Sequence, residues 1–145
     1  MEKLIIYLAD DDHEDRQFFM DALDGIPLQT EVTHFDNGLD LMDKLFCDDT
    51  LPDIVFLDLY MPIMDGFECL MDIRNFKKFD EIQIVVYSTS FRQREVNQLK
   101  NDGANQYLKK SSSFKELKKL INKSLHKALS INSEKKEDRE FIILT

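Results

Sequence analysis

Three short runs of this sequence are apolar at successive positions instead of alternating with polar residues. They cover residues 4–8, 54–57 and 82–87, and each is rich in β-branched or aliphatic side chains. Such runs are typical of strands that are buried on both faces of a parallel sheet. Because a parallel crossover needs a helix, we expect helices between these strands.

Segments with helical spacing do lie between and after the three runs. Weaker strands are predicted at residues 31–36 and 105–109, and Gly103 is a plausible cap at the end of the fourth helix. The apolar positions of the five predicted helices are Phe18, Phe19, Ala22 and Leu23; Leu41, Met42, Leu45 and Phe46; Phe67, Leu70 and Met71; Val96 and Leu99; and Phe114, Leu117, Ile121, Leu125 and Ala128. Five βα units in this order predict an α/β fold, a doubly wound five-stranded parallel sheet with helices on both faces.

Length and charge narrow the class of protein further. A chain of 145 residues suits one domain, which we place at residues 1–129, followed by a tail at residues 130–145. The net charge of −9 would repel a phosphate backbone, so nucleic acid is not expected as a partner. The apolar runs are far shorter than the ~20 residues needed to span a bilayer, so we expect no membrane contact and a cytoplasmic location.

Polar and charged residues follow the predicted strands at the point where each strand ends. In open parallel sheets, ligands bind at the carboxyl ends of the strands, which share one rim. The residues at these ends are Asp10, Asp11 and Asp12; Asp58; Ser88 and Thr89; and Lys109 and Lys110. Carboxylates, hydroxyls and ammonium groups are therefore predicted to meet at one rim.

This combination suits phosphoryl transfer. Clustered carboxylates repel one another unless a cation intervenes, and Mg²⁺ with oxygen ligands removes that repulsion. A carboxylate can attack phosphorus, and catalysis then consists mostly of positioning and charge neutralisation. We take Asp58 as the nucleophile because it ends the most central strand. Asp10 and Asp11 are the candidate metal ligands, Lys110 the counter-charge and Ser88 a hydrogen-bond donor.

Each of these signals also has a plain structural interpretation. Asp12 could cap the first helix, with Asp15 supporting its first turn. Lys109 and Lys110 could form a solvated strand end, and Ser88 could satisfy a turn. The joint placement of all these residues at consecutive strand ends favours a site.

The sequence resembles the response regulator receiver family over about residues 3–129. The most specific stretch is DIVFLDLYMPIMDGFECL, which matches the D-x-x-M-P-x-x-D-G phosphoacceptor pattern from Asp58 to Gly66. The resemblance implies the flavodoxin-like strand order 2-1-3-4-5. It also implies that Asp58 is the phosphorylated residue, that Asp10, Asp11, Asp58 and the backbone carbonyl of Tyr60 bind Mg²⁺, and that Ser88 and Lys110 contact the phosphoryl group.

The resemblance further implies a switch. Tyr107 falls on the aromatic position three residues before Lys110, so Ser88 would move toward the phosphoryl group and Tyr107 would shift inward behind it. This movement would remodel the face made by the fourth helix, fifth strand and fifth helix. The alternative for Tyr107 is a half-buried residue with its hydroxyl in water.

The sequence departs from the family at one position of the site. The family usually has Pro after its Lys, often with a cis peptide bond, whereas Ser111 follows Lys110 here. A non-proline cis bond costs about 3–4 kcal/mol, so this loop is either trans or strained. Lys109 should point to the opposite face of the strand, which leaves Lys110 as the better candidate.

No output domain follows the predicted receiver in this sequence, so we expect a stand-alone module. Its partners would be a histidine kinase or histidine phosphotransfer protein and an unknown protein target, and it would be a monomer or a phosphorylation-dependent homodimer. We interpret the tail as disordered, with addition of residues 141–144 to a sheet edge, in cis or on a partner, as the alternative. Deletion of residues 131–145 is expected to leave phosphorylation intact.

The function that we predict is a phosphorylated signalling switch, which is not an enzyme except that it assists its own phosphorylation and dephosphorylation. Two other functions are alternatives to it. One is a pseudo-receiver, a constitutive interaction module that is never phosphorylated. The other is an aspartyl-phosphate hydrolase, but the dehalogenase-like phosphatases need D-x-D at the nucleophile, and Tyr60 occupies the second acidic position here.

Overall fold

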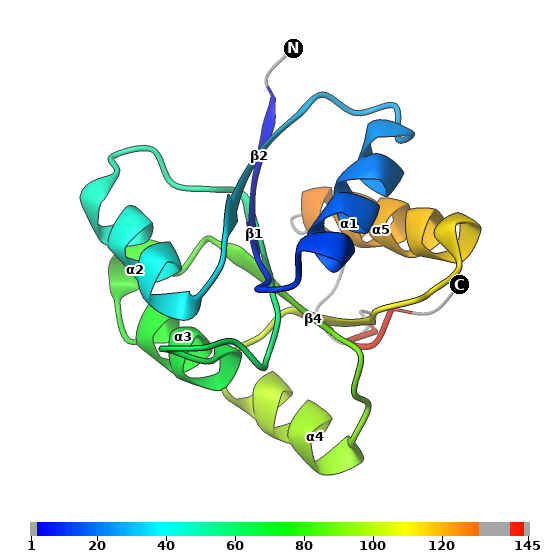
Figure 1. Cartoon of the computed structure of the whole chain (residues 1–145). Helices are drawn as coiled ribbons and strands as arrows, with labels where there is room; N and C mark the ends of the chain where they lie inside the picture. Colours follow the sequence, from blue (N-terminus) through cyan, green and yellow to red (C-terminus); the bar gives the residue numbers. More distant parts are fainter. Residues whose placement is uncertain (1–2, 131–139, 144–145) are drawn as a thin grey trace.

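The structure, a computed structural model, describes residues 3–130 and 140–143. Its five strands form one parallel sheet in the order β2-β1-β3-β4-β5, which confirms the predicted doubly wound topology (Figure 1). The strands are β1 (Leu4–Ala9), β2 (Thr30–Phe35), β3 (Ile54–Leu57), β4 (Gln83–Ser88) and β5 (Gln106–Lys109). Strand order reverses beside β1, so the rim formed by β1 and β3 is the expected place for a ligand.

Five α-helices cover the two faces of the sheet. They are α1 (His13–Asp24), α2 (Gly38–Cys47), α3 (Gly66–Arg74), α4 (Gln93–Asn101) and α5 (Phe114–Leu129). Helices α1 and α5 pack side by side on one face, and α2 and α3 lie together on the other (Figure 1). Val96 and Leu99 of α4 join the core layer of α2 and α3.

The buried strands explain the continuous apolar runs. All four residues of β3 are buried, and its side chains alternate between the two core layers. Phe56 stacks edge-on against Phe19 of α1 at 4.8 Å between ring centroids, whereas Leu57 packs into the layer of α2 and α3. The two-sided core fixes β3 rigidly, and with it the residue that follows, Asp58.

The sequence missed one short element, the 3₁₀-helix η1 (Lys77–Phe79). Its buried Phe79 packs against the rings of Phe46 and Phe76. The predicted role of Gly103 is confirmed, since it has a φ of 109° just past the end of α4. This left-handed conformation favours glycine.

The expectation of a disordered tail is wrong for residues 141–143. Tyr107 N–H donates to the Phe141 carbonyl at 2.8 Å, and Ile143 N–H donates to the Tyr107 carbonyl at 2.9 Å. These bonds form a parallel bridge between Tyr107 and Ile142 on the outer edge of β5. The cis form of the edge-addition alternative is therefore correct; the polar stretch at 131–139 lies outside the described residues.

The helices within the described ranges are too short or too polar to cross a membrane.

Candidate functional site

Two carboxylates meet where β1 and β3 end. The Asp58 N–H donates to the Ala9 carbonyl at 3.0 Å, so the β1–β3 ladder continues into the site. The Asp10 N–H donates to the Phe35 carbonyl at 3.0 Å on the other side of β1. Asp10 is fully buried and Asp58 is only 7% exposed. Their backbones are thus held by the sheet and not by a mobile loop.

Lys110 joins these carboxylates from the end of β5. Its Nζ atom lies 2.8 Å from Asp10 Oδ2 and 3.0 Å from Asp58 Oδ2. The Nζ atom also lies over the Tyr87 ring, 5.1 Å from the centre of that ring. The neighbouring Lys109 is exposed, so Lys110 and not Lys109 lies among the carboxylates; its role toward a phosphoryl group stays a prediction.

Asp11 completes a group of carboxylates suited to a metal ion. Ligand atoms of Asp10, Asp11 and Asp58 all lie within 4.8 Å of one another. Among the described residues, the buried Asp10 Oδ2 has no well-directed hydrogen-bond donor, although the Lys110 ammonium is an ion-pair partner. One ammonium cannot neutralise three carboxylates, and this oxygen-rich, anionic set fits a hard divalent cation such as Mg²⁺.

The electrostatics of the site appear in the pKa of Asp58. Burial raises this pKa from 3.8 to about 6, and the charge of Asp10 raises it as well, while Lys110 acts to lower it. Burial also acts to lower the pKa of the Lys110 ammonium, but its contacts with Asp10 and Asp58 outweigh burial and the pKa is raised. Lys110 therefore stays charged. The cluster of Asp10, Asp11, Asp58 and Lys110 keeps a net negative charge when the carboxylates are ionised.

The start of α1 serves both the helix and the site. Asp12 is the N-cap, and its side chain accepts from the Asp15 N–H at 3.0 Å, as the structural interpretation predicts. The Asp12 N–H in turn donates to Asp10 Oδ1 at 3.0 Å. Asp15, expected only to support the first helical turn, also binds Lys110 Nζ through Oδ2 at 2.9 Å. The Asp12 cap thereby orients the Asp10 carboxylate, and Asp15 adds a further carboxylate beside Lys110.

Arg16 is a site residue that the sequence analysis missed. It is only 5% exposed, and its guanidinium donates to the Asp10 carbonyl at 2.7 Å and to Asp36 Oδ1 at 2.5 Å. Its second terminal nitrogen lies 2.6 Å from His13 Nδ1. The sequence contains one indication of this role: Arg16 lies three positions before the core residue Phe19, so both residues share the helix face that is turned to the core. Arg16 fixes the backbone of Asp10 from behind.

Gly66 allows α3 to begin directly against the acceptor strand. A Cβ atom at this position would lie 2.2 Å from the Asp58 carbonyl oxygen and 2.8 Å from Leu59 Cα. The preceding residue, Asp65, is the N-cap and forms a capping box with Glu68. The D-G pair of the sequence pattern is therefore a helix start packed onto the backbone of the nucleophile candidate.

Ser88 and Tyr107 lie behind the carboxylates in one hydrogen-bonded series. Ser88 ends β4 and is 1% exposed, and its Oγ accepts from the Ser90 N–H at 3.3 Å. Tyr107 is fully buried and its hydroxyl donates to the Ser90 carbonyl. The alternative of a half-buried Tyr107 with its hydroxyl in water is wrong.

Two further predictions for this rim concern Tyr60 and the peptide bond between Lys110 and Ser111. The Tyr60 side chain is 51% exposed, and its hydroxyl donates to Glu95 Oε2 of α4 at 2.7 Å. A role for the Tyr60 carbonyl toward a metal stays a prediction. The described chain contains no cis peptide bond, so the Lys110–Ser111 bond is trans and the strained alternative does not hold.

Fold and site together define an α/β protein with an acidic rim at its strand ends, where three carboxylates lie close enough to hold a metal ion. The family model described as response regulator receiver domain matches residues 6–122. The chain therefore belongs to the response regulator receiver domain family, a component of two-component signalling.

Relatives and solved structures agree with this assignment. The chain is 27% identical over 124 residues to the probable methanogenesis regulatory protein FilR2 of Methanothrix harundinacea, covering 83% of this chain and 80% of that protein. The phosphorylated cyanobacterial phytochrome response regulator RcpA superposes with a TM-score of 0.82 at 26% identity, over 91% of this chain and 98% of that one. The Mn²⁺-bound response regulator Rcp1 gives 0.76 at 25% identity, over 90% and 96%.

Proposed function

We propose that this receiver domain accepts a phosphoryl group on Asp58, in the presence of Mg²⁺, and changes its protein-binding face in response. The observation that carries this proposal is the Lys110 ammonium, held within 3.0 Å of both Asp10 and Asp58 at the rim of the sheet. A buried carboxylate beside a fixed cation is both a nucleophile and a place where added negative charge is tolerated.

In the proposed transfer, an Asp58 oxygen forms a bond to phosphorus while the bond from phosphorus to the donor breaks. With a phosphohistidine donor, the electrons of the broken P–N bond stay on the imidazole, which leaves neutral after protonation. The Leu59 N–H donates to Asp58 Oδ1 at 2.8 Å and orients the carboxylate. Lys110 lies close enough to exchange its contact with Asp58 Oδ2 for a contact with a phosphoryl oxygen.

Asp10, Asp11, Asp58 and the Tyr60 carbonyl would hold the Mg²⁺ ion. When bound, this ion neutralises charge on the phosphoryl oxygens and on the carboxylates around it. The carboxylate spacing and the incompletely paired Asp10 Oδ2 support this assignment, as does the Mn²⁺-bound form of the relative Rcp1.

Signal output in this proposal depends on Ser88 and Tyr107. Ser88 would donate its hydroxyl to a phosphoryl oxygen and give up its present contact with Ser90. Tyr107, already buried and bonded to the Ser90 carbonyl, would be held inward. The partners would be a histidine kinase or phosphotransfer protein and a protein target, with the receiver acting in the cytoplasm as a monomer or a phosphorylation-dependent homodimer.

A constitutive pseudo-receiver is the second candidate, and an aspartyl-phosphate hydrolase the third. The complete set of carboxylates and Lys110 at the rim favours the switch over the pseudo-receiver. Tyr60 at the second position after Asp58 counts against the hydrolase. In the switch, the domain is no turnover enzyme and assists only its own phosphorylation and dephosphorylation.

Intact-mass measurement after incubation with Mg²⁺ and a small acyl phosphate tests the proposal. We expect one added phosphoryl group, and none with Asp58→Ala or with chelated metal. Asp53→Ala changes an exposed aspartate at the opposite, amino-terminal end of the same strand and should still be phosphorylated. A folded protein that gains no phosphoryl group would favour the pseudo-receiver.

A further inference from the structure

Residues 140–143 lie along the edge of the sheet on a single residue of β5. Both backbone hydrogen bonds of this contact, from Tyr107 N–H to Phe141 and from Ile143 N–H to Tyr107, involve Tyr107. The same residue carries the hydroxyl that reaches the Ser90 carbonyl. The segment therefore binds the backbone of the β5 residue whose hydroxyl contacts Ser90, two positions after Ser88 at the end of β4.

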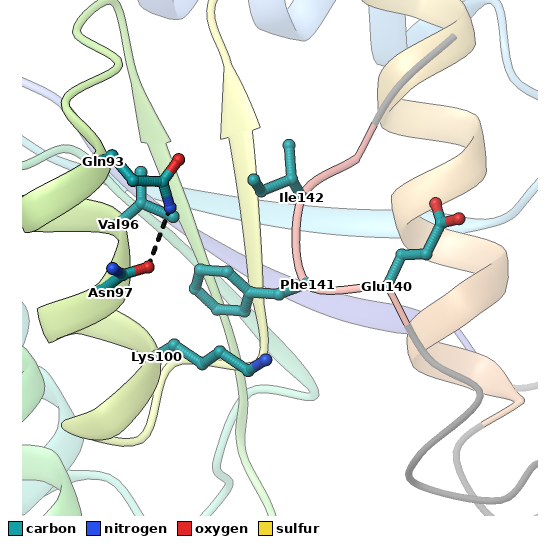
Figure 2. Close-up of a pocket in the computed structure, with 7 residues that line it drawn as sticks. All are labelled: Gln93, Val96, Asn97, Lys100, Glu140, Phe141 and Ile142. Atoms are coloured by element: carbon teal, nitrogen blue, oxygen red, sulfur yellow. Dashed lines mark hydrogen bonds between the residues drawn. The ribbon is translucent and has the colours of Figure 1, made fainter.

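The side chains of the segment fill both sides of this edge. Phe141 points into the space between α4 and β5, close to Val96 and Lys100 (Figure 2). Ile143 is only 3% exposed and belongs to the core layer of α5, near Leu120. A groove of about 410 Å³ remains between α4 and the segment. The segment thus lies on the β5 edge of the face formed by α4, β5 and α5.

Aromatic contacts join the segment to the buried ring of Tyr107. The ring centroid of Tyr107 is 6.5 Å from that of Phe141 and 5.9 Å from that of Phe91. Tyr107 itself has no exposed surface. Since exposure of this ring would break its contact with Phe141, a docked segment stabilises the inward position of Tyr107.

A series of direct contacts continues from Tyr107 to the acceptor. Its hydroxyl donates to Ser90, the Ser90 N–H donates to Ser88 Oγ, and the Ser88 carbonyl accepts from the Lys110 N–H at 2.8 Å. Lys110 contacts Asp58 directly. Any movement of Ser88 toward a phosphoryl group must therefore be accommodated by Ser90 and Tyr107.

We infer that residues 140–143 are a built-in strand ligand of β5 whose docking is coupled, through Tyr107, to phosphorylation of Asp58. This inference rests on the proposed function. Phosphorylation and docking both favour the inward Tyr107, so each strengthens the other. In the phosphorylated state, a protein partner meets an α4–β5–α5 face that includes Phe141, and the segment is part of the surface that it recognises.

Amide hydrogen exchange at Ile143, followed by NMR in the full chain, measures docking directly. We expect exchange to slow at least about fivefold when Mg²⁺ and beryllium fluoride, a phosphoryl mimic, are added. Tyr107→Phe keeps the ring and both backbone hydrogen bonds but removes the contact with Ser90, so its exchange should not respond. The rates should also be independent of dilution, because the segment binds its own β5.

Linkage supplies a reciprocal test. Phe141→Ser should weaken the equilibrium affinity for beryllium fluoride by the same factor of about five. Met71→Ser, which truncates an exposed apolar side chain of α3 outside the segment, should leave this affinity unchanged. Unchanged or faster Ile143 exchange in a protein that is phosphorylated on Asp58 would overturn the inference alone, as would dependence on dilution. Absence of phosphorylation by intact mass would overturn the proposed function and the inference with it.

Discussion

Asp58→Asn should stabilise the protein near pH 7 in the absence of divalent metal. The folded state holds the ionised Asp58 in a buried site, where burial and Asp10 raise its pKa from 3.8 to about 6. At about 1.4 kcal/mol per pKa unit, this shift corresponds to about 3 kcal/mol of folding free energy lost at neutral pH. Asn carries no charge and its side-chain oxygen can still accept from the Leu59 N–H.

The gain should be smaller than that upper figure. Asp58→Asn also removes one partner of Lys110, whose ammonium keeps Asp10 and Asp15 at 2.8 and 2.9 Å. The attraction between Lys110 and Asp58 is already part of the Asp58 pKa of about 6, so the further reduction comes from burial of the Asn amide N–H₂ group, which needs an acceptor of its own. We therefore expect a gain of about 1–2 kcal/mol in the free energy of unfolding.

The pH dependence gives the sharper test. Because the folded pKa of Asp58 lies above the unfolded value, protonation stabilises the fold below 3.8, and this stability is lost as pH rises through about 6. The two proteins should be nearly equally stable near pH 4 and diverge between about pH 4 and 7. Urea unfolding of both proteins in a metal chelator measures the difference, with Asp43→Asn on the exposed face of α2 as the matched control. A difference that is absent at pH 7, or the same at all pH values, would refute the reasoning.

Three further predictions concern Mg²⁺ binding, the Lys110 ammonium and Gly66 at the start of α3. Mg²⁺ at a hundred times its Kd should raise the free energy of unfolding of the unmutated protein by about 2.7 kcal/mol, seen as a higher thermal midpoint, whereas Asp10→Asn should respond weakly in the same scan. The affinity for Mg²⁺ should fall below about pH 6, where protonation of Asp58 competes with the ion. Lys110→Met should lower stability near pH 7 by about 3 kcal/mol in chelator, because it leaves buried carboxylates unpaired, and a metal-free urea titration in which it is as stable as the parent would contradict this. Gly66→Ala should cost about 2 kcal/mol or more and slow phosphorylation in the mass assay, since its Cβ would meet the Asp58 carbonyl at 2.2 Å; normal phosphorylation would show that α3 shifts without moving Asp58.

Much of the fold was predictable because a parallel sheet leaves a strong signal in the sequence. Strands buried on both faces must be apolar throughout, so β1, β3 and β4 stand out. The rim residues follow from topology alone, because parallel strands place all their carboxyl ends together. That reasoning located Asp10, Asp58 and Lys110 without any information on side-chain positions.

The residues that the sequence did not reveal depend on packing between elements. Asp15 is three positions after a helix cap, where an acid is common for local reasons, and only the packing of the whole domain brings the start of α1 to Lys110 at the end of β5. From the sequence alone Arg16 resembles a surface residue, because only the packed orientation of α1 directs its side chain toward the Asp10 carbonyl. Neither contact has a sequence spacing of its own, since each joins segments whose distance is set by the core.

The edge strand at residues 141–143 shows a different limit. Three apolar residues after a polar stretch carry little information about where they bind, and loop closure over a linker of about ten residues costs little more than over a shorter one. What decides the outcome is the outer edge of β5, where the Tyr107 N–H and carbonyl pair with Phe141 and Ile143 beside Val96 of α4 and the apolar core layer of α5. An open edge of this kind favours pairing with any suitable strand, and the nearest one available belongs to the same chain. Docking in cis thus both protects the edge and places Phe141 against the aromatic residue that links it to Asp58.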